Sequence, residues 1–146
     1  MLQKQLALKW NELIGNPFLQ DLPFKIELNR WGKIEMSPAS NLHGKVQTQI
    51  ANELSKKRGG VVLTECSIQT SDGVRVADVA WLSKKLDAEF GEQTPYPKAP
   101  EICVEVMSPG NTWPEMHMKA ALYLEAGAKE VWIQPIDGKR VVIRPD

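Results

Sequence analysis

The segments Arg75-Val76-Ala77-Asp78-Val79 and Ile102-Cys103-Val104-Glu105-Val106-Met107 decide the fold class of this chain. Each places one acidic residue inside an apolar run of the kind that forms a buried β-strand. Because an unpaired buried charge is very costly, each carboxylate is expected to have a partner or to bind a ligand. Hard divalent cations prefer oxygen ligands, and carboxylates on neighbouring strands, whose backbones lie about 4.8 Å apart, can reach one ion. We therefore consider Asp78 and Glu105 candidate ligands of Mg²⁺ or Mn²⁺.

Both carboxylates also have a simpler interpretation. Asp78 could be an edge-strand acid that faces solvent or pairs with the nearby Arg75. Glu105 shares its strand face with Cys103 and Met107, which favours a partner or a ligand over plain exposure to solvent.

A lysine downstream adds to this pair. Lys119 follows Glu115 by four residues on a helix predicted at 113–126. A lysine beside metal-binding carboxylates can orient or deprotonate the attacking water, or stabilise a pentavalent phosphorane-like charge. Such an assembly suits metal-assisted hydrolysis of phosphodiester bonds, with Glu115 positioning Lys119. The simpler interpretation is a surface i,i+4 ion pair, which contributes about 0.3–0.5 kcal/mol.

Two residues of a helix predicted at 42–57 are accessory candidates. His43 lies at the start of this helix and shares a face with Gln47 and Ile50, so it could cap the helix or contact the substrate. Glu53 lies close to the apolar stripe and could reach the metal site as an accessory acid. A surface glutamate whose methylene groups pack along the helix is the alternative.

Hydrophobic spacing and turn residues predict the remaining elements. Helices are expected at 2–14, 42–57 and 113–126, strands at 24–28, 33–36, 61–69, 74–82, 101–107, 130–134 and 140–144, and a loop or short helical excursion at 84–100. From residue 42 the order is α-β-β-β-α-β plus a terminal strand, an α/β arrangement with a mixed central sheet flanked by helices. We expect one domain over residues 1–146, with a core at 41–135 and an N-terminal helix and β-hairpin at 1–40 decorating it.

Composition restricts the function classes. The 146 residues carry no net charge, and the pI is near 6.7. Nucleic-acid-binding surfaces usually carry a basic excess, so contacts with phosphate would have to be local. Lys56-Lys57-Arg58 and Lys84-Lys85 are the basic candidates, with an ordinary solvated charge run as the alternative.

The two cysteines and the absence of long apolar runs bear on location. Cys66 and Cys103 lie in strand-like runs without a CxxC motif or a Cys/His cluster, so buried free thiols are expected. No segment resembles a signal peptide, and none approaches the roughly 20 apolar residues that cross a bilayer. We expect a soluble protein of a reducing cytoplasm, without a membrane partner.

Four ordered blocks of the sequence resemble the Uma-two family, a branch of the PD-(D/E)XK nuclease superfamily, and together they cover most of the chain. The blocks are Gly32-Lys33-Ile34-Glu35-Met36-Ser37-Pro38 followed by His43, then Arg75-Val76-Ala77-Asp78-Val79, then Ala99-Pro100-Glu101-Ile102-Cys103-Val104-Glu105-Val106-Met107-Ser108-Pro109, and last Glu115-xxx-Lys119-xxx-Tyr123-xxx-Gly127-xx-Glu130-Val131-Trp132.

This resemblance implies a restriction-endonuclease-like core in which Asp78 and Glu105 bind the metal ion. In many superfamily members a lysine stands two residues after the glutamate. Met107 occupies that position here, so the resemblance implies that Lys119 is a migrated substitute.

At three positions the chain departs from the family pattern. Ala77 replaces a proline, which has little consequence. Glu115 replaces an aspartate, and its longer side chain can shift the contact that it makes. Gln134 replaces a further aspartate, so any role of that acid is absent.

The expected function is that of an Mg²⁺- or Mn²⁺-dependent endonuclease that hydrolyses phosphodiester bonds in DNA. Because a duplex has two strands, we expect a homodimer, with Trp113 and Trp132 as candidate apolar contacts. One alternative is a catalytically idle interaction or nucleic-acid-binding module of the same fold, which zero net charge favours and the intact acidic pair opposes. Another is a metal-dependent hydrolase of RNA or nucleotides.

Overall fold

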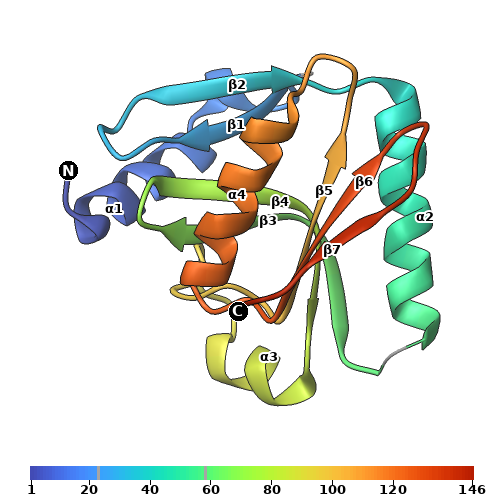
Figure 1. The fold of residues 1–146 in the computed structure, drawn as a ribbon. Helices are drawn as coiled ribbons and strands as arrows, with labels where there is room; N and C mark the ends of the chain where they lie inside the picture. The colour runs from blue at the N-terminus through green and yellow to red at the C-terminus, as the bar shows by residue number, and fades with distance from the viewer. Residues whose placement is uncertain (23, 58) are drawn as a thin grey trace.

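The computed structural model describes residues 1–22, 24–57 and 59–146, without the side chain of Lys57 (Figure 1). Its elements are α1 (Gln3–Ile14), the 3₁₀ turn η1 (Pro17–Leu19), β1 (Phe24–Leu28), β2 (Ile34–Pro38), α2 (Asn41–Lys57), β3 (Val61–Thr70), β4 (Gly73–Leu82), α3 (Lys84–Phe90), β5 (Ile102–Met107), α4 (Trp113–Glu125), β6 (Glu130–Pro135) and β7 (Val141–Ile143). The predicted mixed sheet flanked by helices is confirmed.

Seven strands of the described chain form one sheet, in the order β2-β1-β4-β5-β6-β7, with β3 paired to β4. The β5–β6 pair is parallel, and the other neighbouring pairs are antiparallel. The N-terminal hairpin, which we expected only to decorate the core, therefore extends the central sheet.

Strand β4 has an unusual position in this sheet. β3 pairs along its whole length, from Gly73 to Leu82. The other edge is shared: β1 pairs only at Val74, and β5 pairs only from Val79 to Trp81. The stretch of β4 between these two contacts faces a gap between strands, and Asp78 lies in that gap.

Helices cover both faces of the sheet (Figure 1). On one face α4 packs Met116, Ala120 and Tyr123 against the core, at the i, i+4, i+7 spacing of an amphipathic helix. On the other face α2 packs Ile50 and Leu54 against alternate residues of β4, β5 and β6. Helix α1 covers the β1 end of the sheet. None of the described helices is long and apolar enough to cross a membrane.

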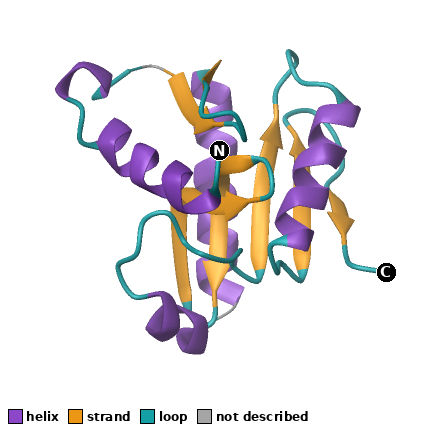
Figure 2. Ribbon diagram, turned by 90° about the vertical axis from the view of Figure 1, so that its left-hand side faces the viewer, coloured by secondary structure: helices purple, strands orange, loops and turns teal. Residues whose placement is uncertain are grey.

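The segment at 84–100, expected to be a loop or short helical excursion, begins with α3. The Ser83 hydroxyl caps this helix by accepting a 3.2 Å hydrogen bond from the Leu86 backbone N–H. Figures 1 and 2 place α3 at the end of the molecule opposite the β1–β2 hairpin. Its exposed Lys84 and Lys85 therefore lie away from the hairpin, and Arg58 of the other basic run lies outside the described residues.

Two further expectations concern buried side chains. Cys66 and Cys103 are buried free thiols, as predicted, and burial raises the pKa of Cys66 to about 12. Trp132, expected at a dimer contact, is only 7% exposed and packs in the core beside α2. That expectation was wrong because the β6 face that carries Trp132 is covered by α2. Trp113 is 40% exposed.

Gly73 fixes the turn that brings the hairpin onto β4. It has φ +81°, and a Cβ there would overlap the Leu28 carbonyl oxygen and lie 2.7 Å from that of Asn29. We expect Gly73→Ala to lower the free energy of unfolding by about 2–4 kcal/mol, because a left-handed backbone and a steric overlap combine. Urea denaturation measures this change. Gly44→Ala is the control, since a Cβ at this α2 position meets nothing within 4 Å, and this variant should not be destabilised.

Candidate active site

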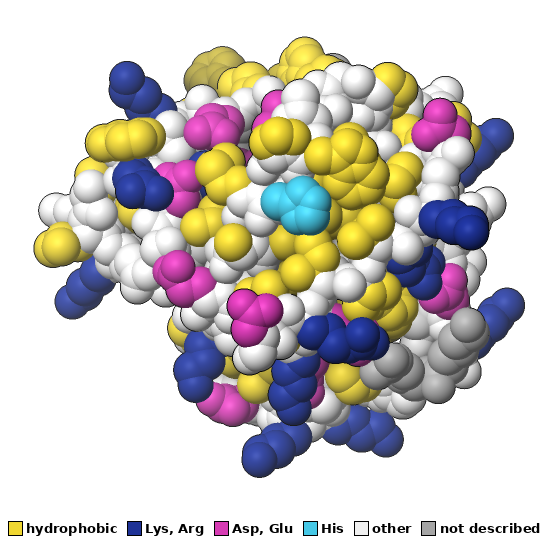
Figure 3. Space-filling model, in the orientation of Figure 1, with side chains coloured by type: hydrophobic (Ala, Val, Ile, Leu, Met, Phe, Trp, Pro, Cys, Tyr) yellow, Lys and Arg dark blue, Asp and Glu magenta, His cyan; other side chains and the backbone are white. Residues whose placement is uncertain are grey.

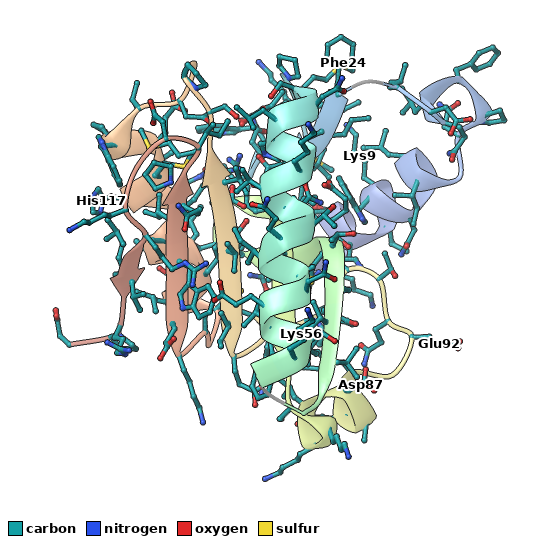
Figure 4. The ribbon with its side chains drawn as sticks, turned by 90° about the vertical axis from the view of Figure 1, so that its right-hand side faces the viewer. Lys9, Phe24, Lys56, Asp87, Glu92 and His117 are labelled. Carbon is teal, nitrogen blue, oxygen red and sulfur yellow. The ribbon has the colours of Figure 1, made fainter. Side chains whose placement is uncertain are left out.

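A cleft of about 740 Å³ opens beside the gap in β4. Its walls come from the hairpin, the start of α2, the ends of β4 and β5, and α4. The lining residues are Leu22, Phe24, Lys25, Met36, Ser37, Pro38, Ala39, His43, Glu65, Asp78, Glu105, Val106, Ser108, Gly110, Asn111, Glu115, Met116 and Lys119. Figure 4 shows Phe24 at the rim, next to the N-terminal end of α2.

Asp78 and Glu105 meet at the point where β4 and β5 separate. Backbone pairing ends at Val79, and beyond it the side chains take over. The Val106 N–H donates to Asp78 Oδ2 at 2.7 Å, and the Asp78 N–H donates to Glu105 Oε2 at 3.3 Å. Both carboxylates are 2% exposed. Buried N–H groups need partners, so the strand gap itself holds the two acids in place.

Glu27 of β1 fills the same gap one step along β4. Its Oε2 accepts a 2.8 Å hydrogen bond from the Val76 N–H, and it is 3% exposed. Two buried carboxylates, from β1 and from β5, thus satisfy the free edge of β4 where no strand pairs with it.

Two lysines link these three acids. Lys119 Nζ lies 2.9 Å from Glu105 Oε1 and 2.8 Å from Glu27 Oε1. Lys25 Nζ lies 3.2 Å from Asp78 Oδ1 and 3.2 Å from Glu105 Oε1. The cluster therefore alternates in charge from Glu27 through Lys119, Glu105 and Lys25 to Asp78.

The electrostatics follow from this alternation. Burial by itself would raise the pKa of Asp78, but the charge of Lys25 and a hydrogen bond from His43 lower it to about 2. Burial by itself would lower the pKa of Lys25, yet the charges of Glu105 and Asp78 raise it above its ordinary value. Burial raises the pKa of Glu105, although Lys119 and Lys25 oppose the change. Asp78 and Lys25 are thus held in their charged forms.

His43 joins the cluster from the first turn of α2. Its Nε2 lies 3.3 Å from Asp78 Oδ2, and the Ser40 hydroxyl accepts a hydrogen bond from its backbone N–H. The hydrogen bond to Asp78 raises the pKa of His43, and burial opposes the rise. The helix start that the sequence predicted for His43 is what brings it to the second oxygen of Asp78.

The structure does not bring the two other accessory candidates into the cluster. Glu53 forms an ion pair with Arg140, at 2.6 Å, because its position ten residues beyond His43 lies about 15 Å along α2. Glu115 lines the cleft, but among the described residues Lys119 pairs with Glu27 and Glu105 and not with Glu115. The predicted positioning role belongs to Glu27 instead.

The family of this chain follows from its sequence. Residues 17–146 match the model of the Uma2 (Uma-two) family, described as "Putative restriction endonuclease". The chain belongs to the Uma2 family.

One solved structure is similar to this Uma2 chain, the crystal structure of a "putative nuclease belonging to DUF820 from Anabaena variabilis ATCC 29413". The TM-score is 0.61 at 15% sequence identity, over 82% of this chain and 76% of that one. At this identity the likeness shows a shared fold. Among curated proteins, none matches the chain. Family and fold are those of nucleases.

Sequence reasoning missed three residues of the Uma2 chain's cleft. Lys25 and Glu27 stand two apart on β1 and so share one strand face, which is a signal that alternation offers. Nothing in the sequence indicated that this face meets β4. Glu65 is the third: the β3–β4 register passes over it where it faces Asp78, and its Oε1 accepts a 3.0 Å hydrogen bond from Gln47.

Glu65 carries local backbone strain, with φ 53° in the middle of β3. A non-glycine residue in the left-handed region costs about 1 kcal/mol. We expect Glu65→Gly to raise the free energy of unfolding by about 0.5–1 kcal/mol despite the lost hydrogen bond. Urea denaturation checks this, with Glu65→Gln as the control that retains the strain. A glycine variant less stable than the glutamine variant would contradict it.

Asp72 provides a pH-dependent contribution to stability outside the cleft. Burial by itself would raise its pKa, but hydrogen bonds from the Arg30 side chain and backbone and the charge of Arg75 lower it. A lowered folded-state pKa stabilises the fold above the unfolded pKa of about 3.9, and this contribution disappears as the pH falls below that value. We therefore expect stability to decline less steeply between pH 5 and pH 2 in Asp72→Asn than in wild type, measured by urea denaturation. Parallel curves would contradict the prediction.

Asp78 and Glu105 fit a hard divalent cation. Asp78 Oδ1 and both Glu105 carboxylate oxygens already surround one positive charge, the Lys25 ammonium, at 3.2–3.3 Å. The described residues hold no group of three or more His, Cys, Asp or Glu side chains arranged around one ion. An ion bound here would keep positions for water or phosphate oxygens, as Mg²⁺ commonly does.

Proposed function

We propose that this Uma2 protein is a metal-dependent endonuclease that hydrolyses phosphodiester bonds in DNA, with Mg²⁺ or Mn²⁺ as cofactor. One observation carries the proposal: Asp78 and Glu105, both buried, converge on a single cationic point at the base of an open cleft, with Lys119 2.9 Å from Glu105. Membership of a nuclease family supports it.

Each residue of the cluster has a distinct part in this reaction. Asp78 and Glu105 would hold the metal, which when bound activates water and polarises phosphoryl oxygens. The Val106 N–H and His43 fix the orientation of the Asp78 carboxylate. Lys119, held by Glu27, presents an ammonium at the cleft wall, where it can orient the attacking water or stabilise charge on the phosphate.

The test combines binding with cleavage. Mn²⁺ is titrated into the protein by calorimetry, and the protein is then incubated with Mg²⁺ or Mn²⁺ and supercoiled plasmid, single-stranded DNA or RNA of matched length. We expect saturable binding and nicking of the plasmid that EDTA abolishes. Binding with cleavage of RNA alone would replace DNA as the substrate, and no metal binding in any chain would contradict the enzyme.

An interaction role has one observation in its favour. Apolar side chains gather on the face that carries α4 (Figure 3), where Trp113 and Met118 are 40% and 54% exposed. Exposed patches of this kind mark interaction surfaces. We propose that this face joins two copies of the chain into a homodimer. Sedimentation that gives a dimer for wild type and a monomer for Trp113→Ser supports this, and a wild-type monomer contradicts it.

A further inference from the structure

Lys25 lies where the proposed metal would bind. Its Nζ lies 3.2 Å from Asp78 Oδ1 and 3.2 and 3.3 Å from the two Glu105 oxygens, so three oxygens of the candidate ligand pair surround one ammonium. No other lysine in the described chain is recorded in contact with both acids, since Lys119 pairs with Glu105 and Glu27.

A metal ion and this ammonium would use the same oxygen atoms. A divalent ion bonded to carboxylate oxygens at about 2.0–2.1 Å fills the space between them, and it would repel a second cation placed there. Lys25 lies on β1, lines the open cleft and carries a flexible four-carbon chain, so it can leave without a change of the backbone.

We infer that Lys25 is a built-in counter-ion of the active site, which occupies the metal position in the metal-free protein and is displaced into the cleft when the metal binds. This inference rests on the proposed function. It assigns Lys25 two states: paired with Asp78 and Glu105 when the metal is absent, and free in the cleft, within reach of a bound phosphate, when the metal is present.

Lysine reactivity tests this displacement in the unmodified protein. The wild type is treated with an amine-acylating reagent with and without saturating Mg²⁺, and the rate at each lysine is read by mass spectrometry. An ammonium released from two carboxylates becomes accessible, so we expect acylation of Lys25 to accelerate several-fold while that of Lys119, still paired with Glu27, changes little. An unchanged rate at Lys25 with the metal bound would overturn the inference and leave the nuclease proposal intact.

Metal affinity gives the second test. Removing a competing cation should strengthen binding, so we expect Lys25→Met to bind Mn²⁺ about tenfold more tightly than wild type by calorimetry. The variant should also unfold at a lower temperature without metal and gain more from added Mn²⁺. Lys119→Met is the matched control, because it also removes one charge in contact with Glu105.

The pattern across the three chains separates the outcomes. A larger gain in Lys25→Met than in Lys119→Met supports occupation of the metal position. Equal gains would mean that only the overall charge matters, and unchanged or weaker binding in Lys25→Met would mean that Lys25 does not compete; either overturns the inference. Binding by Lys25→Met but not by wild type supports it while removing the proposed activity from wild type. No binding by any chain contradicts both.

Discussion

Asp78→Asn and Glu105→Gln are each expected to lower the rate of plasmid nicking at least about 10³-fold, equivalent to roughly 4 kcal/mol of transition-state stabilisation. Each change removes one charge from the pair that converges on a single cation, at 3.2 Å from each acid. Steady-state nicking at saturating Mg²⁺ measures the rate, and calorimetry should show that Mn²⁺ binding is lost in parallel.

These two variants keep the shape of the site. An amide oxygen at position 78 can still accept the hydrogen bond from the Val106 N–H, and one at position 105 can still accept that from the Asp78 N–H. Circular dichroism and thermal unfolding verify that both fold. Glu89→Gln, an exposed carboxylate of α3 outside the cleft, should nick at the wild-type rate. Full activity in either active-site variant would contradict the assigned metal ligands.

Glu27→Ala should lower the free energy of unfolding by about 3–5 kcal/mol, the range found when one partner of a buried ion pair is removed. The truncation leaves the Val76 N–H without its acceptor and takes from Lys119 one of its two carboxylates. Urea denaturation at pH 7 measures the loss. In the folded fraction we also expect slower nicking, because Glu27 holds Lys119 at the cleft wall.

Two comparisons isolate the cause of this effect. Glu27→Gln keeps an acceptor for the Val76 N–H and should cost less than Glu27→Ala. Glu12→Ala removes an exposed carboxylate of α1 and should change stability by less than about 0.5 kcal/mol. A Glu27→Ala protein as stable as wild type would show that the strand gap does not need this carboxylate.

The two acids at the centre of the cleft could be found from sequence because burial and charge conflict at those positions. Asp78 and Glu105 interrupt apolar strands, and the free-energy cost of burying a lone charge makes such an interruption informative without any knowledge of the neighbours. Elements predicted from local periodicity, such as α2 and the β3–β4 pair, were correct for a similar reason: the spacing of apolar residues reports which face is buried.

The partners of these acids depended on contacts distant in sequence. Lys25 and Glu27 reach the cleft only because β1 pairs with β4 at Leu28 and Val74, 46 positions apart in the chain. The i,i+4 spacing favoured Glu115 as the partner of Lys119, but Glu27 from another strand took that place. Likewise, the distance along α2 placed Glu53 beside Arg140, and the packing of α2 buried Trp132.

By itself, then, the sequence determined the order and faces of the elements and the two acids that need a counter-charge, since both depend on local periodicity and on the cost of burial. Only the tertiary structure decided which cations supply that counter-charge. The choice depends on where β4 is left without a neighbouring strand, and that gap is created jointly by β1 and β5. The carboxylates that fill it, and the lysines that pair with them, are selected by geometry across the sheet, which no local pattern encodes.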